Sequence, residues 1–328
     1  MQNKACKGVL SIISMLMQCD EALPSCGNCA RRGVECRYHK ERNTVSTFNV
    51  MDMELMHFYA SESYIALQIE GSFPNALWRD QVPRIAFKNP VLMHALLCFS
   101  ASHLLHISGE AKYDEAMRFH KHHALSLMRT QLDSKVDEAV YGTGVILALQ
   151  SIGTFNSFGG YPTDLDWIGL VTGFRSLVAE MWDGRHQSIF YPLIEAYQPL
   201  EVNEDGLRKF NLLRIQSQLP PRYSEHVKAL GTLLASIFPG DYYDSPRDIR
   251  TTERSMMPDG RAVRYLLAWI ATVPESFVSR AKECDSAVLM LLLWVFAVFR
   301  QVYRDKPLWW LERIAKQGIE DIQKVMSS

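Results

Sequence analysis

The 328-residue chain lacks the short motifs that identify the common enzyme classes. It contains no HExxH pair for a zinc protease, no GxSxG turn for a nucleophilic serine, no GxGxxG loop and no GxxxxGK loop followed by Ser or Thr. Histidine is the remaining candidate for catalytic chemistry, because six histidines fall on two expected helices: His94, His103, His106, His120, His122 and His123. His103 and His106 could share a helix face and bind a metal ion. We interpret the six as partly buried or surface residues and predict that the protein is not an enzyme.

A membrane-spanning length of apolar sequence is also lacking. The uninterrupted apolar run Ala287–Phe299 has thirteen residues, whereas a span needs about 20. Asp285 precedes this run and Arg300 follows it, so we predict a central core helix and no membrane span. A second apolar stretch, Gly8–Gln18, lies near the N-terminus. No small-residue cleavage site follows it, so we do not expect a secretory signal.

Alternating apolar and polar residues, which indicate half-buried strands, are scarce, and no internal repeat of fixed period is present. Apolar residues recur instead at helical spacing, which predicts an all-α domain over residues 52–328. Asp52 is expected to cap the first helix and Pro90 to occupy the first turn of the next. Further helices are expected near residues 112–132, 137–153, 164–182, 206–218, 222–237, 260–272, 284–304 and 307–326.

Cysteine is scarce outside the N-terminus, since five of the seven cysteines fall in the first 36 residues. Four of them follow a regular spacing of six, two and six intervening residues: Cys19, Cys26, Cys29 and Cys36. Two cysteines separated by two residues on a tight turn can direct both sulfurs at one tetrahedral ion, and Pro24 and Gly27 favour such turns. We interpret the segment as a zinc site, the alternative being a disulfide pair or inert thiols.

The two remaining cysteines, Cys98 and Cys284, stand alone in apolar helical stretches. We expect both to be core residues, and the usage of cysteine suits a reducing compartment.

The spacing of Cys19, Cys26, Cys29 and Cys36 resembles the second half of the fungal binuclear zinc cluster, in which six cysteines hold two zinc ions and present a basic helix to DNA. These four cysteines match the third to sixth positions of the cluster, and Pro24 matches its loop proline. The resemblance implies a transcription regulator that binds zinc and DNA. It would act in the nucleus and could stay in the cytoplasm when inactive.

The first half of the cluster departs from that pattern. Twelve residues separate Cys6 from Cys19, where the family has nine, and no cysteine follows Cys6 at the position of the second ligand. The uncharged stretch Gly8–Gln18 replaces the basic run from which the family contacts the DNA groove. Either an error at an exon boundary or a truly degenerate cluster accounts for this stretch. DNA binding by this chain is expected to be weak or impaired.

When the ligand positions of the family are applied to this sequence, one zinc ion has a complete set of four ligands and the other does not. The complete set is Cys6, Cys26, Cys29 and Cys36, whereas the incomplete set is Cys6, Cys19 and Cys26. The resemblance therefore implies one well-held zinc ion, where an intact family member has two. Cys19 could substitute for Cys6 if the apolar stretch cannot loop back.

Residues 1–42 carry seven Lys and Arg and four Asp and Glu, a net charge of +3, while the whole chain carries −1. Arg31, Arg32 and Arg37 are the candidates for contacts with DNA phosphates, or else form part of a solvated basic tail. Residues 1–36 are thus predicted to be a partial zinc cluster and residues 37–51 a linker. No heptad repeat occurs in this linker, so homodimerisation stays undecided.

Residues 51–326 also resemble the C-terminal regulatory domains of fungal sterol uptake control proteins. The resemblance rests on four segments in order: ELMHFYASES (54–63), NPVLMHALLCFSASHL (89–104), the apolar segment around Trp167, and PLWWLERIAKQGIEDI (307–322). It implies a helical domain that holds a hydrophobic ligand and controls sterol or secondary-metabolism genes. Tryptophan could wall such a pocket, although aromatic residues at helical spacing are usually core. The alternative is a helical ligand-binding or partner-binding regulator whose vestigial zinc arm does not bind DNA.

Overall fold

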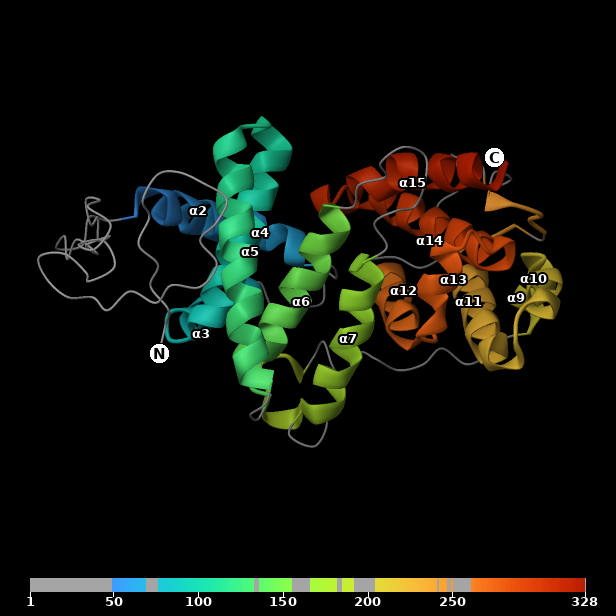
Figure 1. Cartoon of the computed structure of the whole chain (residues 1–328), viewed down its shortest axis with the longest axis horizontal. Coiled ribbons are helices and arrows are strands. Elements are labelled where there is room, and N and C mark those ends of the chain that lie inside the picture. Colours follow the sequence, from blue (N-terminus) through green and yellow to red (C-terminus); the bar gives the residue numbers. More distant parts are fainter. Residues whose placement is uncertain are drawn as a thin grey trace, which may run out of the picture. The chain divides into compact units, whose positions relative to one another are not determined.

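Helices form every regular element in the part of the chain that the structure describes. The structure is a computed structural model, and the described residues are 49–68, 76–132, 136–154, 166–181, 185–191, 204–240, 242–246, 249 and 261–327. No β-strand occurs in these ranges, which confirms the predicted all-α fold. Residues 50–328 form one compact unit (Figure 1), called the helical unit below.

The unit begins with a helical hairpin and the short elements that pack on it. Helix α2 spans Val50–Ser61 and packs on α4 (Pro90–Ser108). Helices α4 and α5 (Ala111–Leu132) pack against each other and form the hairpin (Figure 1). Asn89 precedes α4 in an extended conformation and Pro90 occupies its first turn, as predicted. Gly109, at φ +68°, ends α4 in the left-handed conformation that favours glycine. Short helical elements at Ser63–Leu67 (η1), Leu77–Gln81 (η2) and Val82–Ala86 (α3) join α2 to α4.

Helix α6 (Glu138–Gly153) connects the hairpin to the rest of the unit. It packs on α4, on α7 (Asp166–Met181) and on α15 (Trp309–Ser327). The Asp137 side chain accepts a hydrogen bond of 2.9 Å from the Val140 amide and so caps the helix. A Cβ on Gly142 would lie 3.0 Å from the Phe190 ring, so this glycine permits close packing. A 3₁₀ turn, η3, covers Arg185–Gln187.

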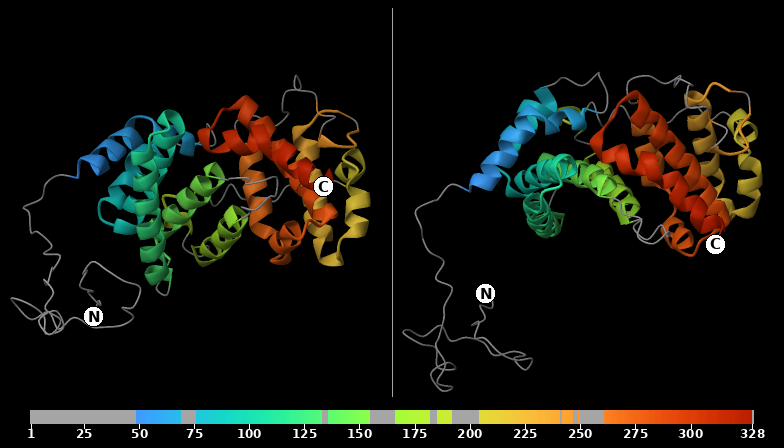
Figure 2. Two further views of the ribbon diagram at one scale, coloured as in Figure 1. Left: turned by 45° about the horizontal axis from the view of Figure 1, so that its top comes forward. Right: turned by 90° about the horizontal axis from the view of Figure 1, so that it is seen from above.

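The C-terminal half gathers around a buried helix, α14 (Ser286–Asp305), with α15 lying beside it (Figure 2). Thirteen consecutive residues of α14, from Ala287 to Phe299, are buried apart from the half-buried Met290, which confirms the predicted core helix. The surrounding elements are α9 (Asp205–Lys209), α10 (Leu212–Gln218), η4 (Pro221–Tyr223), α11 (Ser224–Ile237), α12 (Arg261–Thr272) and α13 (Ser276–Lys282).

Two of the described helices, α4 and α14, are long and apolar enough to cross a membrane by length and composition alone. Their most apolar windows are 56% and 78% buried inside the unit, as core helices are. The two helices are therefore no evidence of a membrane span.

The helix boundaries depart from the sequence prediction at three places. The helix expected at 206–218 is two helices, because Asn211 adopts φ +51° between α9 and α10. Helix α13 and the helical segment at residues 77–86 were not predicted. The expected cap of α2 at Asp52 is wrong, since α2 begins at Val50 and the Asp52 carboxylate contacts a histidine of α5 instead.

Candidate functional sites

The predicted zinc and DNA residues all lie in residues 1–48, outside the described residues. This applies to the metal ligands Cys6, Cys19, Cys26, Cys29 and Cys36, and to the phosphate contacts Arg31, Arg32 and Arg37. The chemistry of the donor set can still be judged, because thiolate sulfur is a ligand that zinc prefers in structural sites. Four thiolates within eighteen residues meet the number of ligands that one tetrahedral zinc ion requires.

The two cysteines of the helical unit have different environments. Cys98 is fully buried in α4, and burial raises the pKa of its thiol to about 12, so this cysteine is an inert core residue, as predicted. Cys284 is exposed in the turn between α13 and α14, at φ +60°. The prediction of a core role for Cys284 is therefore wrong, because the helix it was placed in begins two residues later.

Three helices bring an aspartate and three histidines together. The His120 Nε2–H donates to the Asp52 carboxylate at 3.2 Å, and the Nδ1 atoms of His94 and His120 lie 2.9 Å apart. The rings of His94 and His123 stack with centroids 5.1 Å apart, and His123 Nδ1–H donates to the Phe119 carbonyl. With His120 neutral, its Nδ1 accepts from His94, so each of these three hydrogen bonds has one donor and one acceptor.

His103 and His106, considered above as a metal-binding pair, have separate partners. His103 stacks on Trp309 with an interplanar angle of 10°, and its Nδ1 lies 3.1 Å from the Ser63 hydroxyl. His106 pairs with Glu312 of α15 at 2.7 Å. No group of three or more His, Cys, Asp or Glu side chains within the described ranges is arranged to hold a metal ion. His103 is half-buried and His106 is exposed, which agrees with the interpretation made from the sequence, and both join α4 to neighbouring elements.

Acidification is expected to destabilise the helical unit through these histidines. Burial lowers the pKa values of His94 and His120, and it lowers the pKa of His103 to about 4. Nearby histidines act in the same direction, and Asp52 opposes them at His94 and His120. The unfolded chain then binds protons that the folded chain does not. Stability is complete above about pH 6.5 and falls as the pH approaches 4, by up to about 1.4 kcal/mol per pH unit for each such histidine.

Urea unfolding followed by far-ultraviolet circular dichroism across this range measures the slope, and His103→Asn should make it shallower. Asparagine keeps a polar group near Ser63 but does not titrate. His57→Asn at an exposed position of α2 is the control. An unchanged slope in His103→Asn would contradict the assignment.

A pocket of about 700 Å³ opens where α5, α6 and α7 meet the turn between α12 and α13. Its apolar wall consists of Trp167, Leu170, Val273, Pro274 and Val278, and its polar groups come from Lys121, Ser151, Thr154, Thr172 and Glu275. The volume lies in the range of small-molecule sites, about 300–1,000 Å³. Of the tryptophans within the described residues, only Trp167 lines this pocket, whereas Trp294 and Trp310 are buried in the core.

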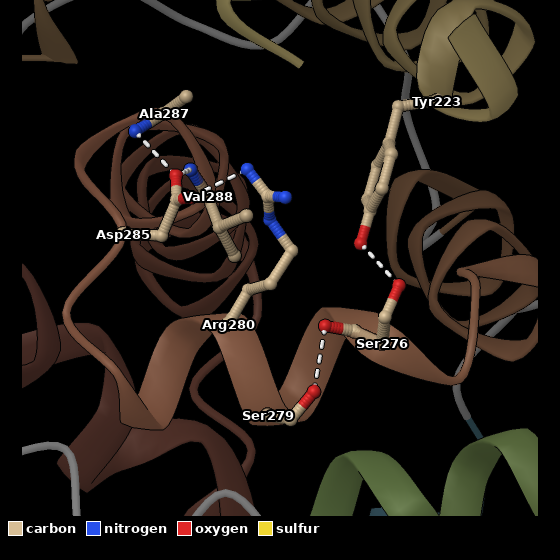
Figure 3. A network of polar contacts seen from close by, with 7 residues as sticks. All are labelled: Tyr223, Ser276, Ser279, Arg280, Asp285, Ala287 and Val288. Atoms are coloured by element: carbon tan, nitrogen blue, oxygen red, sulfur yellow. Dashed lines mark hydrogen bonds and ion pairs between the residues drawn. The ribbon is translucent and has the colours of Figure 1, made fainter. Parts of the chain in front are cut away.

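A network of polar contacts fixes α13, which carries one wall of this pocket (Figure 3). Arg280 forms an ion pair with Asp285, and Asp285 in turn accepts hydrogen bonds from the Ala287 and Val288 amides that cap α14. On the other side, the Tyr223 hydroxyl lies 2.9 Å from the Ser276 hydroxyl. Helix α13 is therefore held between α14 and the start of α11, which sets the position of Pro274 and Val278.

Comparison with known proteins gives two matches to protein families. Residues 17–44 match the fungal Zn(2)-Cys(6) binuclear cluster domain, and residues 54–202 match the fungal specific transcription factor domain. The first match contains Cys19, Cys26, Cys29 and Cys36. It begins after Cys6 and includes only the last two residues of the stretch Gly8–Gln18.

Similar proteins include two fungal sterol uptake control proteins. The chain is 27% identical to sterol uptake control protein 2 of Saccharomyces cerevisiae over 162 residues, which are 46% of this chain and 18% of that protein. It is 27% identical to the protein of the same name in Candida albicans, over 45% of this chain and 22% of that protein. A Zn(2)-C6 fungal-type transcription factor of Gibberella zeae is 21% identical, over 82% of this chain and 57% of its own length.

These relatives extend well beyond the matched region, since the chain covers about a fifth of the length of the two sterol uptake control proteins. The two family matches nonetheless follow one another in the order that the cysteine spacing and the helical patterns predicted. Residues 17–44 and 54–202 thus match, in this order, a fungal zinc cluster domain and a fungal transcription factor domain, and the chain is similar to fungal Zn(2)-C6 transcription factors.

Proposed function

We propose that this protein is a nuclear DNA-binding regulator of transcription, with sterol or secondary-metabolism genes as its targets. The observation that carries the proposal is the match of residues 17–44 to the zinc cluster domain, followed directly by a helical unit whose first part matches the transcription factor domain. Residues 1–36 would contact DNA and residues 52–328 would form the regulatory domain. Residues 37–51 would be the linker between them. The domain matched by residues 54–202 is one of transcription factors, which favours a protein without enzymatic activity.

Under this proposal, residues 1–36 hold one zinc ion firmly, because only one set of four thiolates is complete. Cys26, Cys29 and Cys36 would bind it together with Cys6 or Cys19. The bound ion supplies a fixed folding centre, since small zinc domains fold only with metal. Arg31, Arg32 and Arg37 would then face DNA phosphates and give a salt-sensitive attraction.

Zinc content gives the first test. The full chain purified under reducing conditions is expected to carry about one zinc ion per chain, as zinc has four ligands in structural sites. Cys29→Ser should release that zinc, because it removes a ligand from the complete set. Cys284→Ser is the matched control, since Cys284 is an exposed thiol of the helical unit and should leave the zinc content unchanged. Retention of zinc by Cys29→Ser would contradict the ligand assignment.

DNA binding gives the second test. A gel shift with a salt series is expected to show weak binding that is lost as salt rises, because a few contacts of basic side chains with phosphates depend on charge alone. These contacts carry no sequence information. Replacing Arg31 and Arg32 together by Gln should lower affinity for all DNA sequences alike. Binding of the zinc-loaded chain that resists salt and distinguishes sequences would show an intact reader and overturn the expectation of impaired DNA binding.

One sequence feature favours a second candidate function. The stretch Gly8–Gln18 occupies the place of the family's basic run and carries no charge. A chain without the groove-contacting residues could still act through its helical unit, by binding a ligand or a partner. Zinc-loaded protein that shows no DNA binding at low salt would support this candidate over the first.

The helical unit is proposed to receive its signal as a hydrophobic small molecule. The pocket between α5, α6, α7 and the α12–α13 turn supports this proposal, because it combines an apolar wall with a few polar groups. Figure 1 shows that these elements belong to both halves of the helical unit, so a molecule bound there would contact both. A molecule bound only by the folded chain raises its melting temperature, which gives the test.

A further inference from the structure

The hydroxyl groups that line the pocket already donate their hydrogen bonds to carbonyl groups of the protein. Ser151 donates to the Ala148 carbonyl at 2.7 Å, and Thr154 donates to the Gln150 carbonyl at 3.2 Å. Thr172 likewise donates to the Gly169 carbonyl at 2.9 Å. Each hydroxyl is thereby committed as a donor to its own helix, and its oxygen can only accept a hydrogen bond from a bound molecule.

Two donors of the pocket have no partner. The indole nitrogen of Trp167 is buried without a hydrogen-bond acceptor, in a side chain that is 2% exposed. The half-buried Lys121 forms no ion pair or hydrogen bond with any part of the chain that the structure describes. The buried indole nitrogen of Trp167 lacks an acceptor, and the ammonium of the half-buried Lys121 favours an anionic partner.

The apolar wall of the pocket favours a ligand whose remaining part is apolar. Trp167 and Val273 are buried, and Leu170 and Val278 are half-buried beside them. A chain of methylene groups would remove this surface from water, at about 0.8 kcal/mol for each group buried. Glu275, the only acidic group among the described lining residues, is exposed at the start of α13, where water screens its charge.

We propose that this pocket binds an amphipathic carboxylic acid, with the carboxylate at Lys121 and the apolar chain along Trp167, Leu170 and Val273. This inference rests on the proposed ligand-binding function of the helical unit and narrows it to one class of molecule. An uncharged apolar molecule would fill the wall but leave Lys121 without a counter-charge. The pocket would therefore select an acid over the alcohol of the same chain length.

Dodecanoic acid and dodecanol are the probes, compared below their aggregation limits by titration calorimetry and melting temperature with the full chain. The acid is expected to bind one per chain and at least about tenfold more tightly than the alcohol, the ratio that one charge-assisted contact supplies. Equal binding of acid and alcohol would overturn the preference for an acid while leaving the proposed hydrophobic ligand in place. Binding of neither probe would contradict both proposals.

Lys121→Met tests the position of the carboxylate, because methionine keeps the apolar stem and removes the charge. The acid should bind about tenfold more weakly to this variant and the alcohol equally well. Lys316→Met on α15 is the matched control, since Lys316 pairs with Glu312 and does not line the pocket. Unchanged acid affinity in Lys121→Met would overturn the proposal. Lys121→Gln repeats the test with a polar side chain if the methionine variant folds poorly.

Glu275→Gln separates the two charged groups of the pocket. Removing this carboxylate should leave the affinity for the acid unchanged or make it slightly tighter, because like charges repel. Weaker binding of the acid to Glu275→Gln would mean that the carboxylate takes part in binding. That result would contradict an anionic head group.

Discussion

Replacing Trp310 with alanine is expected to lower the free energy of unfolding of the helical unit by about 3–5 kcal/mol, the usual cost of removing a buried tryptophan. Trp310 lies in the first turn of α15 and has no exposed surface. Its indole nitrogen donates to the Ala66 carbonyl at 2.9 Å, which joins the last helix to η1 near the start of the unit. The substitution would therefore leave a large cavity and also an unpaired carbonyl.

The atoms around Trp310 are tightly packed, so they cannot easily move to fill the cavity that Trp310→Ala would leave. A Cβ built on Gly153 of α6 would lie 2.9 Å from the Trp310 Cβ, so the two helices are already in close contact there. A cavity that neighbouring atoms cannot fill costs more than one that they can. Lys306, at the end of α14, also donates to the Gln68 carbonyl at the end of η1, so the turn before α15 has a second link to this region.

Two companion variants separate the contributions at Trp310. Trp310→Phe keeps most of the ring and removes the hydrogen bond, so it should cost about 1–3 kcal/mol. Met326→Ala, near the other end of α15, changes a side chain that is 40% exposed and should cost less than about 0.5 kcal/mol. Urea unfolding of the full chain, followed by circular dichroism, measures all three. A loss in Trp310→Ala no larger than that in Met326→Ala would contradict the packing described here.

Much of the helical fold could be predicted from apolar periodicity, because most long helices bury one face in the core. The helix expected near 112–132 is α5 at Ala111–Leu132, and that expected near 260–272 is α12 at Arg261–Thr272. Short elements escaped prediction because a helix of seven residues, such as α13, shows fewer than two turns of the pattern. The break at Asn211 depends on one residue with φ +51°, for which asparagine is permissive but gives no sequence signal by itself.

The candidate sites differ in how far sequence reasoning could reach them. The zinc ligands were identifiable because their chemistry demands a fixed local spacing. The pocket was not, since Lys121 and Trp167 lie on separate helices and Val273 in the turn after α12, and only the packing of these elements brings the three together. The contact of Asp52 with His120 was missed for the same reason. Helical periodicity indicates which face of a helix is buried but not which helix covers it.

Replacing Gly206 with alanine is expected to destabilise the helical unit by about 2–3 kcal/mol or more, because the added methyl group has nowhere to go. Its Cβ would lie 2.2 Å from the carbonyl oxygen of Gly231 and 2.4 Å from the carbonyl carbon. Both atoms belong to the backbone of α11, so no side chain can rotate away. Helices α9 and α11 would have to separate to admit the group.

The reciprocal substitution should be milder, which makes the pair informative. A Cβ on Gly231 would lie 3.1 Å from the Gly206 carbonyl carbon, which is tight contact rather than overlap. Gly231→Ala also gains helix propensity within α11, worth about 1 kcal/mol. We therefore expect Gly206→Ala to lose clearly more stability than Gly231→Ala, although both change the same contact.

Gly173→Ala provides the matched control, since Gly173 lies inside α7 and its Cβ would meet no atom within 4 Å. The same chemical change should there raise stability by about 0.5–1 kcal/mol, because alanine restricts the unfolded chain and favours helix. Urea unfolding of the three variants should thus give one large loss, one small change and one gain. A loss in Gly206→Ala no larger than that in Gly231→Ala would mean that α9 and α11 do not approach as closely as described.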